Sequence, residues 1–214
     1  PACRIFGTGQ QAAGSAAPST PALIPAPPLW SGVVAISDAI AVEGAYVAAE
    51  PFTLAPESPP KPHHEAFYLM SGRLSGRKFY VHQARGTQPS AERTAENRTI
   101  EPLVPGSTLR FTVDYELLSD DDRRLLLYSL VLEPGLAHKL GLGKPLGLGS
   151  THVTIDRITT VDAASRYRAG GQVVETIEGD TVEPFLDEQL RPFRTSQTFF
   201  LLDLRRVLRF EHRE

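Results

Sequence analysis

The chain has very few sulfur-containing residues. Its 214 residues include one cysteine, Cys3, together with one methionine. A single cysteine cannot form an internal disulfide, and it cannot supply the four ligands that a structural zinc site usually needs. Scarce cysteine is typical of proteins in a reducing compartment. We therefore expect a cytoplasmic protein that binds no metal and uses no cofactor.

Long apolar runs and an excess of positive charge are also absent. Hydrophobic residues make up 41% of the chain, but no run approaches the roughly 20 residues of a membrane-spanning helix. The start of the sequence lacks the basic region and apolar run of a secretory signal. With 22 basic and 25 acidic residues the formal charge is −3, which argues against non-specific nucleic-acid binding unless the charges are unevenly distributed.

The charges are in fact unevenly distributed. No acidic residue occurs from Gly135 to Thr154, and arginine and lysine dominate residues 72–98. Acidic residues gather at 120–122 and 175–188 instead. This distribution allows one basic face, although a protein with scattered, solvated charges fits the composition as well.

The most informative segment is Gly135–Ser150, which reads GLAHKLGLGKPLGLGS. Its glycines alternate with leucines, and its only charged or titratable side chains are two lysines and one histidine. Glycine permits positive φ angles, so such a loop can point several N–H groups at one anion. A loop that merely packs tightly through its leucines is the alternative. The residues expected to contact phosphate are Lys139, Gly141, Gly143, Lys144, Gly147, Gly149 and His138.

The spacing of these glycines excludes two nucleotide-binding motifs. A P-loop requires G-x-x-x-x-G-K-[ST]. Here Pro145 follows Gly143-Lys144, and His138 occupies the position of the first glycine. A dinucleotide fingerprint opens a helix, whereas this glycine run follows an expected one. An ATPase or a Rossmann enzyme is therefore disfavoured.

The flanking sequence predicts a strand, a helix, the glycine loop and a second strand, in that order. Thr108–Leu118 alternates apolar and polar residues as a strand does. Ser119 followed by three aspartates is a helix N-cap with acids in the first turn, and Pro134-Gly135 ends the helix. Alternation over His152–Ile158 predicts the second strand.

This unit resembles part of a known family. The order GSTLRFTVDYELLSDDDRRLLLYSLVLEPGLAHKLGLGKPLGLGSTHVTI is similar to the C-terminal half of a RAMP protein (repeat-associated mysterious protein). These proteins are the RNA-binding subunits of CRISPR effector complexes, and their hallmark is a C-terminal glycine-rich loop. CRIFG at Cys3–Gly7 with SGVVAISDA at Ser31–Ala39 resembles the type III backbone subunits, and GRKFYVHQ at Gly76–Gln83 resembles one RAMP subgroup. The resemblance runs through about Cys3–Ile158.

The resemblance implies a fold and a domain organisation. The expected fold is α+β, a ferredoxin-like (RRM-like) domain over residues 1–166 with a Pro-rich insertion at about 48–64. Residues 167–214 would form a C-terminal extension. One strand–helix half of the family domain would lie upstream of Pro1.

The implied function is to bind CRISPR RNA along its backbone within a type III-like effector complex. Target RNA and other effector subunits would be the partners, and no membrane is involved. The upstream loop that carries the catalytic aspartate of nuclease members has no counterpart here, so a binding role is favoured over catalysis in this chain alone. An endoribonuclease that processes the guide or cuts the target, a protein-only structural subunit and a nucleotide-binding enzyme are the alternatives.

A second candidate contact surface lies upstream of the glycine loop. Arg77 and Lys78 precede Phe79, Tyr80 and His82, a mixture of cations and rings that single-strand binders use for phosphates and bases. An ordinary exposed strand is the alternative interpretation.

Other titratable residues are weaker candidates. His63-His64 lack the i, i+4 spacing of a helical zinc site and fit a loop better. His138 is a candidate base toward a ribose 2′-hydroxyl. Asp38 fits the family's strand-ending aspartate and, more simply, a residue that caps a turn.

The remaining segments carry coarser expectations. Gln10–Leu29 is expected to be a flexible loop, and Pro51–His64 an extended segment without strand pairing. Further expectations concern a strand ending near Asp38-Ala39, a strand at Gln172–Ile177, a hairpin with arms Phe67–Leu69 and Lys78–His82 turned at Ser71-Gly72 or Ser75-Gly76, and a terminal element at Thr198–Phe210. That element would dock on a neighbour, face RNA or pack on the core.

Overall fold

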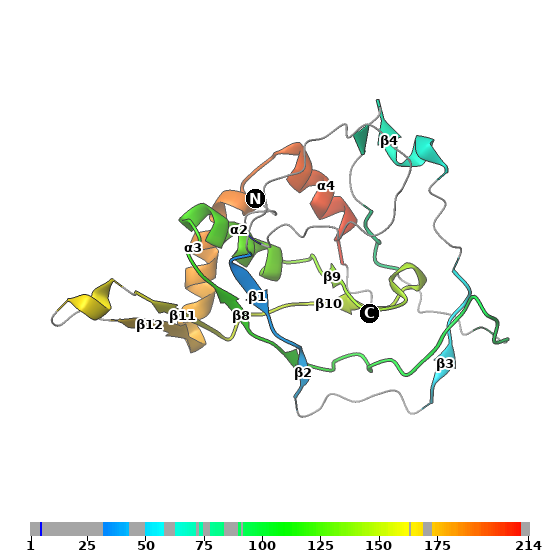
Figure 1. The fold of residues 1–214 in the computed structure, drawn as a ribbon, viewed down its shortest axis with the longest axis horizontal. Coiled ribbons are helices and arrows are strands. Elements are labelled where there is room, and N and C mark those ends of the chain that lie inside the picture. Colours follow the sequence, from blue (N-terminus) through cyan, green and yellow to red (C-terminus); the bar gives the residue numbers. More distant parts are fainter. Residues whose placement is uncertain are drawn as a thin grey trace, which may run out of the picture. The chain divides into compact units, whose positions relative to one another are not determined.

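The computed structural model describes residues 5, 32–42, 50–57, 63–71, 73–74, 78–83, 90, 92–162, 164–168 and 173–210. These residues form an α+β fold of two-stranded antiparallel sheets and three α-helices (Figure 1). The chain divides into two compact units, Pro1–Val47 with Leu103–Leu126 and Ala48–Pro102 with Leu127–Glu214. The expectations for Cys3, for Gln10–Leu29 and for Arg77 lie outside the described residues. No helix among the described residues combines the length and the hydropathy needed to cross a membrane.

The first unit contains an antiparallel ladder. β1 (Val34–Ile36) pairs with β8 (Val113–Tyr115), and β2 (Ile40–Ala41) pairs with β7 (Leu109–Arg110). The strand expected over Thr108–Leu118 is therefore confirmed in β7 and β8.

The exposed Asp38 lies between β1 and β2 of this ladder. Its neighbour Ser37 accepts a hydrogen bond from the Thr112 backbone N–H at 2.9 Å and donates one to the Asp38 carbonyl oxygen at 3.1 Å. β1 thus ends at Ile36, slightly before the predicted position.

The predicted helix is α2 (Asp120–Val131). The Ser119 hydroxyl accepts a hydrogen bond from the Asp122 N–H at 3.2 Å and donates one to the Asp122 carboxylate at 2.8 Å, so the predicted N-cap is present. The helix ends before Leu132, whose φ is +62°. Both ends of this helix are therefore confirmed close to where the sequence placed them.

The core of the second unit is built by α2, β11 (Arg157–Val161) and α3 (Val182–Arg194). α3 was not predicted from the sequence. The signal was present, because Val182, Leu186 and Leu190 recur every four residues on one helical face. The buried core residues are Leu127, Tyr128, Ile158, Val182, Leu186 and Leu190.

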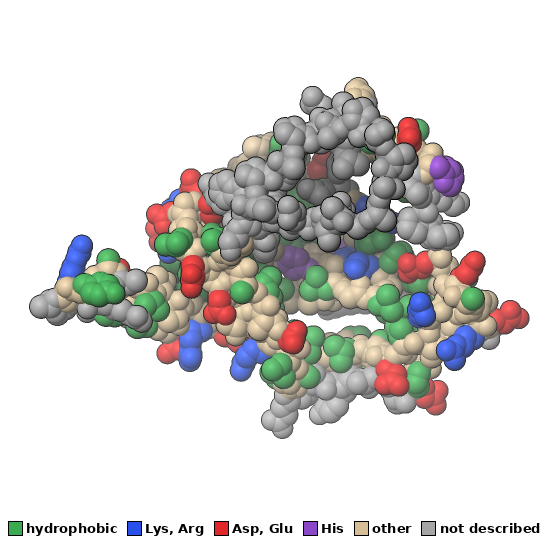
Figure 2. All heavy atoms as spheres, in the orientation of Figure 1, with side chains coloured by type: hydrophobic (Ala, Val, Ile, Leu, Met, Phe, Trp, Pro, Cys, Tyr) green, Lys and Arg blue, Asp and Glu red, His purple; other side chains and the backbone are tan. Residues whose placement is uncertain are grey.

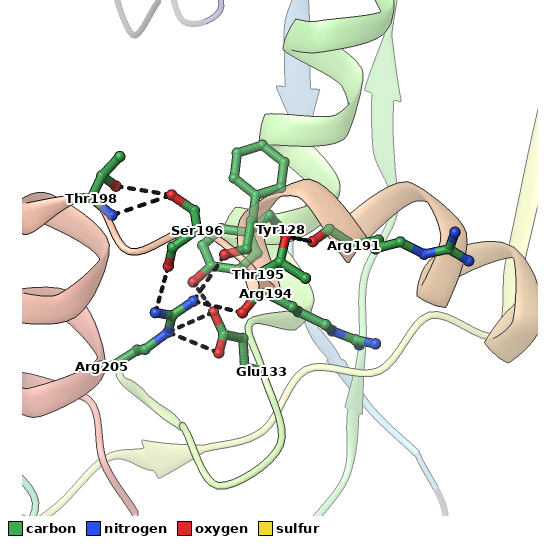
Figure 3. A network of polar contacts seen from close by, with 9 residues as sticks. Tyr128, Glu133, Arg191, Arg194, Thr195, Ser196, Thr198 and Arg205 are labelled. Atoms are coloured by element: carbon green, nitrogen blue, oxygen red, sulfur yellow. Dashed lines mark hydrogen bonds and ion pairs between the residues drawn. The ribbon is translucent and has the colours of Figure 1, made fainter.

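The terminal element is α4 (Phe199–Val207). Leu201 and Leu204 pack against the core, which favours a core-packed role over the two alternatives for this segment. Arg205 on α4 reaches Glu133 and the backbone between α3 and α4 (Figure 3). This network joins the end of α2 to both C-terminal helices.

A hairpin of β11 and β12 (Val174–Glu178) leads into α3. β12 confirms the strand expected at Gln172–Ile177. Apolar side chains lie on the surface near the end of this hairpin, at the left of Figure 2. Val161 and Val174 are about half exposed, and Tyr167 is exposed.

Three sequence expectations were wrong in detail. Part of Pro51–His64 does pair, since β3 (Phe52–Thr53) pairs with β6 (Thr99–Ile100). Neither Phe52 nor Thr53 is a proline, so both keep the N–H that a sheet requires. The strand expected over His152–Ile158 begins only at Arg157, and β10 (Ser150–Thr151) precedes it.

A short hairpin follows η1 (Glu65–Phe67), and its second arm differs from the expected one. β4 (Leu69–Met70) pairs with β5 (Arg73–Leu74), and Ser71 in the turn has a φ of +53°. The turn lies at one of the two expected places, but the second arm is Arg73–Leu74, and Lys78–His82 is not a strand. This leaves Lys78–His82 free to contact another part of the unit.

Candidate nucleic-acid interface

The glycine-rich segment forms a β-hairpin. β9 (His138–Lys139) pairs with β10, with Lys139 opposite Ser150 (Figure 1). The Leu140 N–H donates to the Gly149 carbonyl oxygen at 2.8 Å and closes the loop between them. A single 3₁₀ turn, η2 (Lys144–Leu146), lies inside this loop. The predicted loop after the helix is therefore present, and its ends are held by strand pairing.

A close backbone contact requires glycine at one position of the loop, Gly149, and Gly143 lies close to a leucine side chain. Gly149 has a φ of +78°, and a Cβ there would lie 1.9 Å from the Leu140 carbonyl oxygen. Gly143 has a φ of +73°, and its Cβ would lie 2.8 Å from Leu148 Cδ1. An L-residue disfavours this backbone region, and the contacts add an overlap. The glycines thus determine the shape of the loop.

The loop leaves backbone donors unused. Among the described residues, the N–H groups of Gly141, Leu142 and Gly143 donate no hydrogen bond, whereas the N–H groups of Leu146 and Leu148 both donate to the Gly143 carbonyl oxygen. Gly141 and Leu142 are exposed and Gly143 is buried, so two successive amides, beside the positive-φ Gly141, are open to an anion. The phosphate contacts assigned to this loop stay a prediction, and this geometry is compatible with them.

The two lysines of the loop differ in their surroundings. Lys139 is half-buried, its Nζ donates to the Leu148 carbonyl oxygen at 2.7 Å, and burial lowers its pKa. Lys144 Nζ donates to the Gly141 carbonyl oxygen at 2.8 Å and lies 5.9 Å from the centre of the Tyr80 ring. Lys139 therefore ties the loop together from inside, and Lys144 places its charge beside an aromatic ring.

The second candidate segment lies against this loop. His82 Nδ1 is 2.8 Å from Ser150 Oγ, and His82 Nε2 is 2.9 Å from the Ala137 carbonyl oxygen. The Gln83 amide donates to the Pro145 carbonyl oxygen at 2.5 Å. The structure thus brings together two segments that lie far apart in the sequence. Ser150 and Gln83 lie at the ends of the two segments singled out in the sequence, but neither was predicted as a site residue, because their contacts form only in the tertiary structure.

Lys78 and Tyr80 complete this surface. Lys78 is exposed, and its Nζ lies 5.0 Å from the centre of the Tyr80 ring. Lys144 Nζ lies at a similar distance, 5.9 Å, from the same ring. The hydrogen bond to Tyr80 raises the pKa of Lys78 above its ordinary value. Two ammonium groups thus lie close to one half-buried aromatic ring, a combination that suits a phosphate and an adjacent base.

The other histidine candidates contact the backbone or one another. His138 Nε2 is 2.7 Å from the Leu130 carbonyl oxygen, so this nitrogen donates a proton and ties β9 to α2. His63 and His64 stack edge to face, with ring centres 4.4 Å apart, just before η1. The described residues contain no group of three or more histidine, cysteine or acidic side chains able to hold a metal ion. A catalytic role of His138 stays a prediction.

The pKa of His82 makes the stability of this surface depend on pH. Burial lowers the pKa of His82 below its ordinary value of 6.5, and the nearby charge of Lys139 lowers it further. The unfolded chain therefore takes up this proton at a higher pH than the folded chain. The stability present above pH 6.5 is lost as the pH falls through the folded pKa.

We expect the free energy of unfolding to fall between about pH 7.5 and pH 5.5, and His82→Gln to flatten this dependence. Urea unfolding at both pH values measures it. Identical pH dependence in the wild type and the variant would contradict the assignment to His82.

No protein-family model and no curated protein matches the chain.

Proposed function

We propose that this chain binds single-stranded RNA along its sugar–phosphate backbone, through the glycine hairpin (residues 138–151, which includes the glycine loop) and the segment Lys78–Gln83. The observation that carries the proposal is the contact between these two segments, made by His82 with Ser150 and by Gln83 with Pro145. One segment offers free amides and the other offers a ring with a nearby cation. Phosphate contacts of this kind position a nucleic acid without reading its sequence.

The charge around the loop supports this proposal despite the net charge of −3. Lys78 and Lys144 both lie near Tyr80, and the sequence from Gly135 to Thr154 contains no acidic residue. Local charge, rather than the sum over the chain, determines the affinity for a phosphate. An RNA strand could therefore contact this surface without facing repulsion from a nearby carboxylate of the hairpin.

The resemblance to RAMP proteins supports a more specific proposal. In it, the chain belongs to a ferredoxin-like subunit that holds CRISPR RNA in a type III-like effector complex in the cytoplasm. Guide pairing with target RNA would supply sequence specificity, and other effector subunits would be its protein partners. The role proposed for this chain is binding without cleavage. The endoribonuclease and the protein-only subunit are the two outcomes that the binding experiment must distinguish from it.

We expect Lys144→Ala and Lys78→Ala each to weaken RNA binding roughly fivefold, whatever the RNA sequence. Each change removes one cation from the proposed phosphate path, so the slope of log affinity against log salt should fall by about 1. Fluorescence anisotropy with a labelled single-stranded RNA, measured at several salt concentrations, gives both quantities.

Arg206→Ala is the matched control for this experiment. Arg206 is an exposed cation on α4, 82% exposed and 4.0 Å from Asp203, and it lies outside both segments. Its loss should leave RNA affinity nearly unchanged. An affinity that is insensitive to both lysine changes would contradict the assignment of the phosphate path to this surface. No measurable RNA binding by the wild type would favour the protein-only subunit, and shortened RNA recovered after binding would favour the endoribonuclease.

A further inference from the structure

A chain of hydrogen bonds of fixed direction runs from Ser150 through His82 to the backbone. The Ala137 carbonyl oxygen can only accept, so His82 Nε2, 2.9 Å away, must carry the proton. In the neutral ring the other nitrogen, Nδ1, is then an acceptor. Ser150 Oγ lies 2.8 Å from Nδ1, and its hydroxyl therefore donates to the ring.

The surroundings of His82 hold the ring in this arrangement. Phe210 contacts it edge to face, with ring centres 5.0 Å apart, and the Phe210 N–H is bonded to the Gly135 carbonyl oxygen at 2.8 Å. Burial and the neighbouring Lys139 lower the pKa of His82, which favours the neutral ring. Lys139, His138 and His152 are the titratable groups that oppose a positive charge here. The direction of these hydrogen bonds is thus stable near neutral pH.

The consequence is that the exposed Ser150 oxygen acts as an acceptor. Its one proton is committed to His82, so its remaining lone pairs can only receive a hydrogen bond from a ligand. A phosphate oxygen has no proton to give. A ribose 2′-hydroxyl has one, and deoxyribose lacks the group altogether.

We propose that Ser150, oriented by His82, accepts a hydrogen bond from a ribose 2′-hydroxyl and so selects RNA over DNA at the glycine hairpin. This inference rests on the proposed function, since it assigns one residue of that surface to the sugar rather than to the phosphate. The inference assigns two different roles to the groups of this surface. Free amides and lysines bind phosphate, and a directed hydroxyl acceptor recognises the sugar.

The test uses two single-stranded probes of one sequence, about 15 nucleotides long. One is RNA and the other carries 2′-fluorine in place of every 2′-hydroxyl, which removes the donor while keeping an RNA-like sugar. Their affinities for the full chain are compared with those for Ser150→Ala and Ser150→Thr. We expect the wild type to prefer RNA by about fivefold to tenfold, the worth of one hydrogen bond.

Ser150→Ala should abolish this preference by weakening RNA binding alone. Ser150→Thr keeps a hydroxyl at an exposed strand position and should retain the preference. An unchanged preference in Ser150→Ala, or an equal loss for both probes, would overturn the assignment while leaving RNA binding intact. Absence of binding to either probe by the wild type would overturn the proposed function and this inference together.

Discussion

Gly149→Ala is expected to lower the free energy of unfolding by about 3 kcal/mol and to weaken RNA binding by at least about tenfold. A Cβ at this position would lie 1.9 Å from the Leu140 carbonyl oxygen, well inside van der Waals contact. The positive φ of +78° adds the strain of a left-handed backbone. Relief of both requires the hairpin to open at the Leu140–Gly149 hydrogen bond, which closes the loop.

Gly141→Ala is the matched control for this substitution. Gly141 has a φ of +80° in the same loop, but a Cβ there would meet nothing within 4 Å. Only the backbone strain remains, so we expect a loss of about 1 kcal/mol. Urea unfolding of the two variants separates overlap from strain. Equal losses in both variants would show that the close approach of Gly149 to Leu140 contributes nothing.

Arg205→Ala is expected to destabilise the fold by about 3 kcal/mol. Arg205 Nε lies 3.0 Å from both carboxylate oxygens of Glu133, and its two terminal nitrogens donate to the carbonyl oxygens of Phe193, Arg194 and Ser196 (Figure 3). The Arg205 and Glu133 side chains are only 20% and 14% exposed. Truncation would leave a largely buried carboxylate without its cationic partner, with the Tyr128 hydroxyl as a remaining donor at 2.7 Å, and would leave the carbonyl groups without the Arg205 donors.

The neighbouring position on α4 provides the control for this prediction. Arg206→Ala removes an exposed cation from the same helix and should cost less than about 0.5 kcal/mol. Arg205→Lys keeps the charge but loses the planar, multidentate geometry, so we expect an intermediate loss. Urea unfolding of the three variants at one pH gives the order. A loss from Arg205→Ala no larger than that from Arg206→Ala would contradict the role of this network.

The parts of the fold that the sequence predicted correctly are governed by local interactions. Ser119 and the three aspartates that follow it predict the start of α2, because an N-cap acts within one turn of the chain. The alternation through Thr108–Leu118 likewise predicted β7 and β8. Alternation alone misplaced the strand after the glycine loop, since the chain pairs at Ser150–Thr151 and then only from Arg157.

The candidate site was only partly predictable from the sequence, because its two segments lie far apart in the chain. The glycine loop was visible from composition, and Lys78 with Tyr80 from the mixture of cations and rings. Their contact was not visible, because it depends on His82 meeting Ser150 and Gln83 meeting Pro145 across more than 60 residues. The role of Lys139 in bracing the loop also emerged only with the position of the Leu148 carbonyl.

The sequence alone predicted the capped helix α2 and the left-handed glycines of the loop, because glycines and capping side chains act on their immediate neighbours. The α+β class was expected from the resemblance, and the left-handed backbone at Ser71, Leu117 and Leu132 was not predicted. Tertiary structure alone decided that Lys78–Gln83 lies on the glycine hairpin and that Arg205 joins three helices. It also decided that the Ser150 hydroxyl points its proton at His82. These features depend on groups distant in sequence, whose hydrogen bonds form only when burial brings them together.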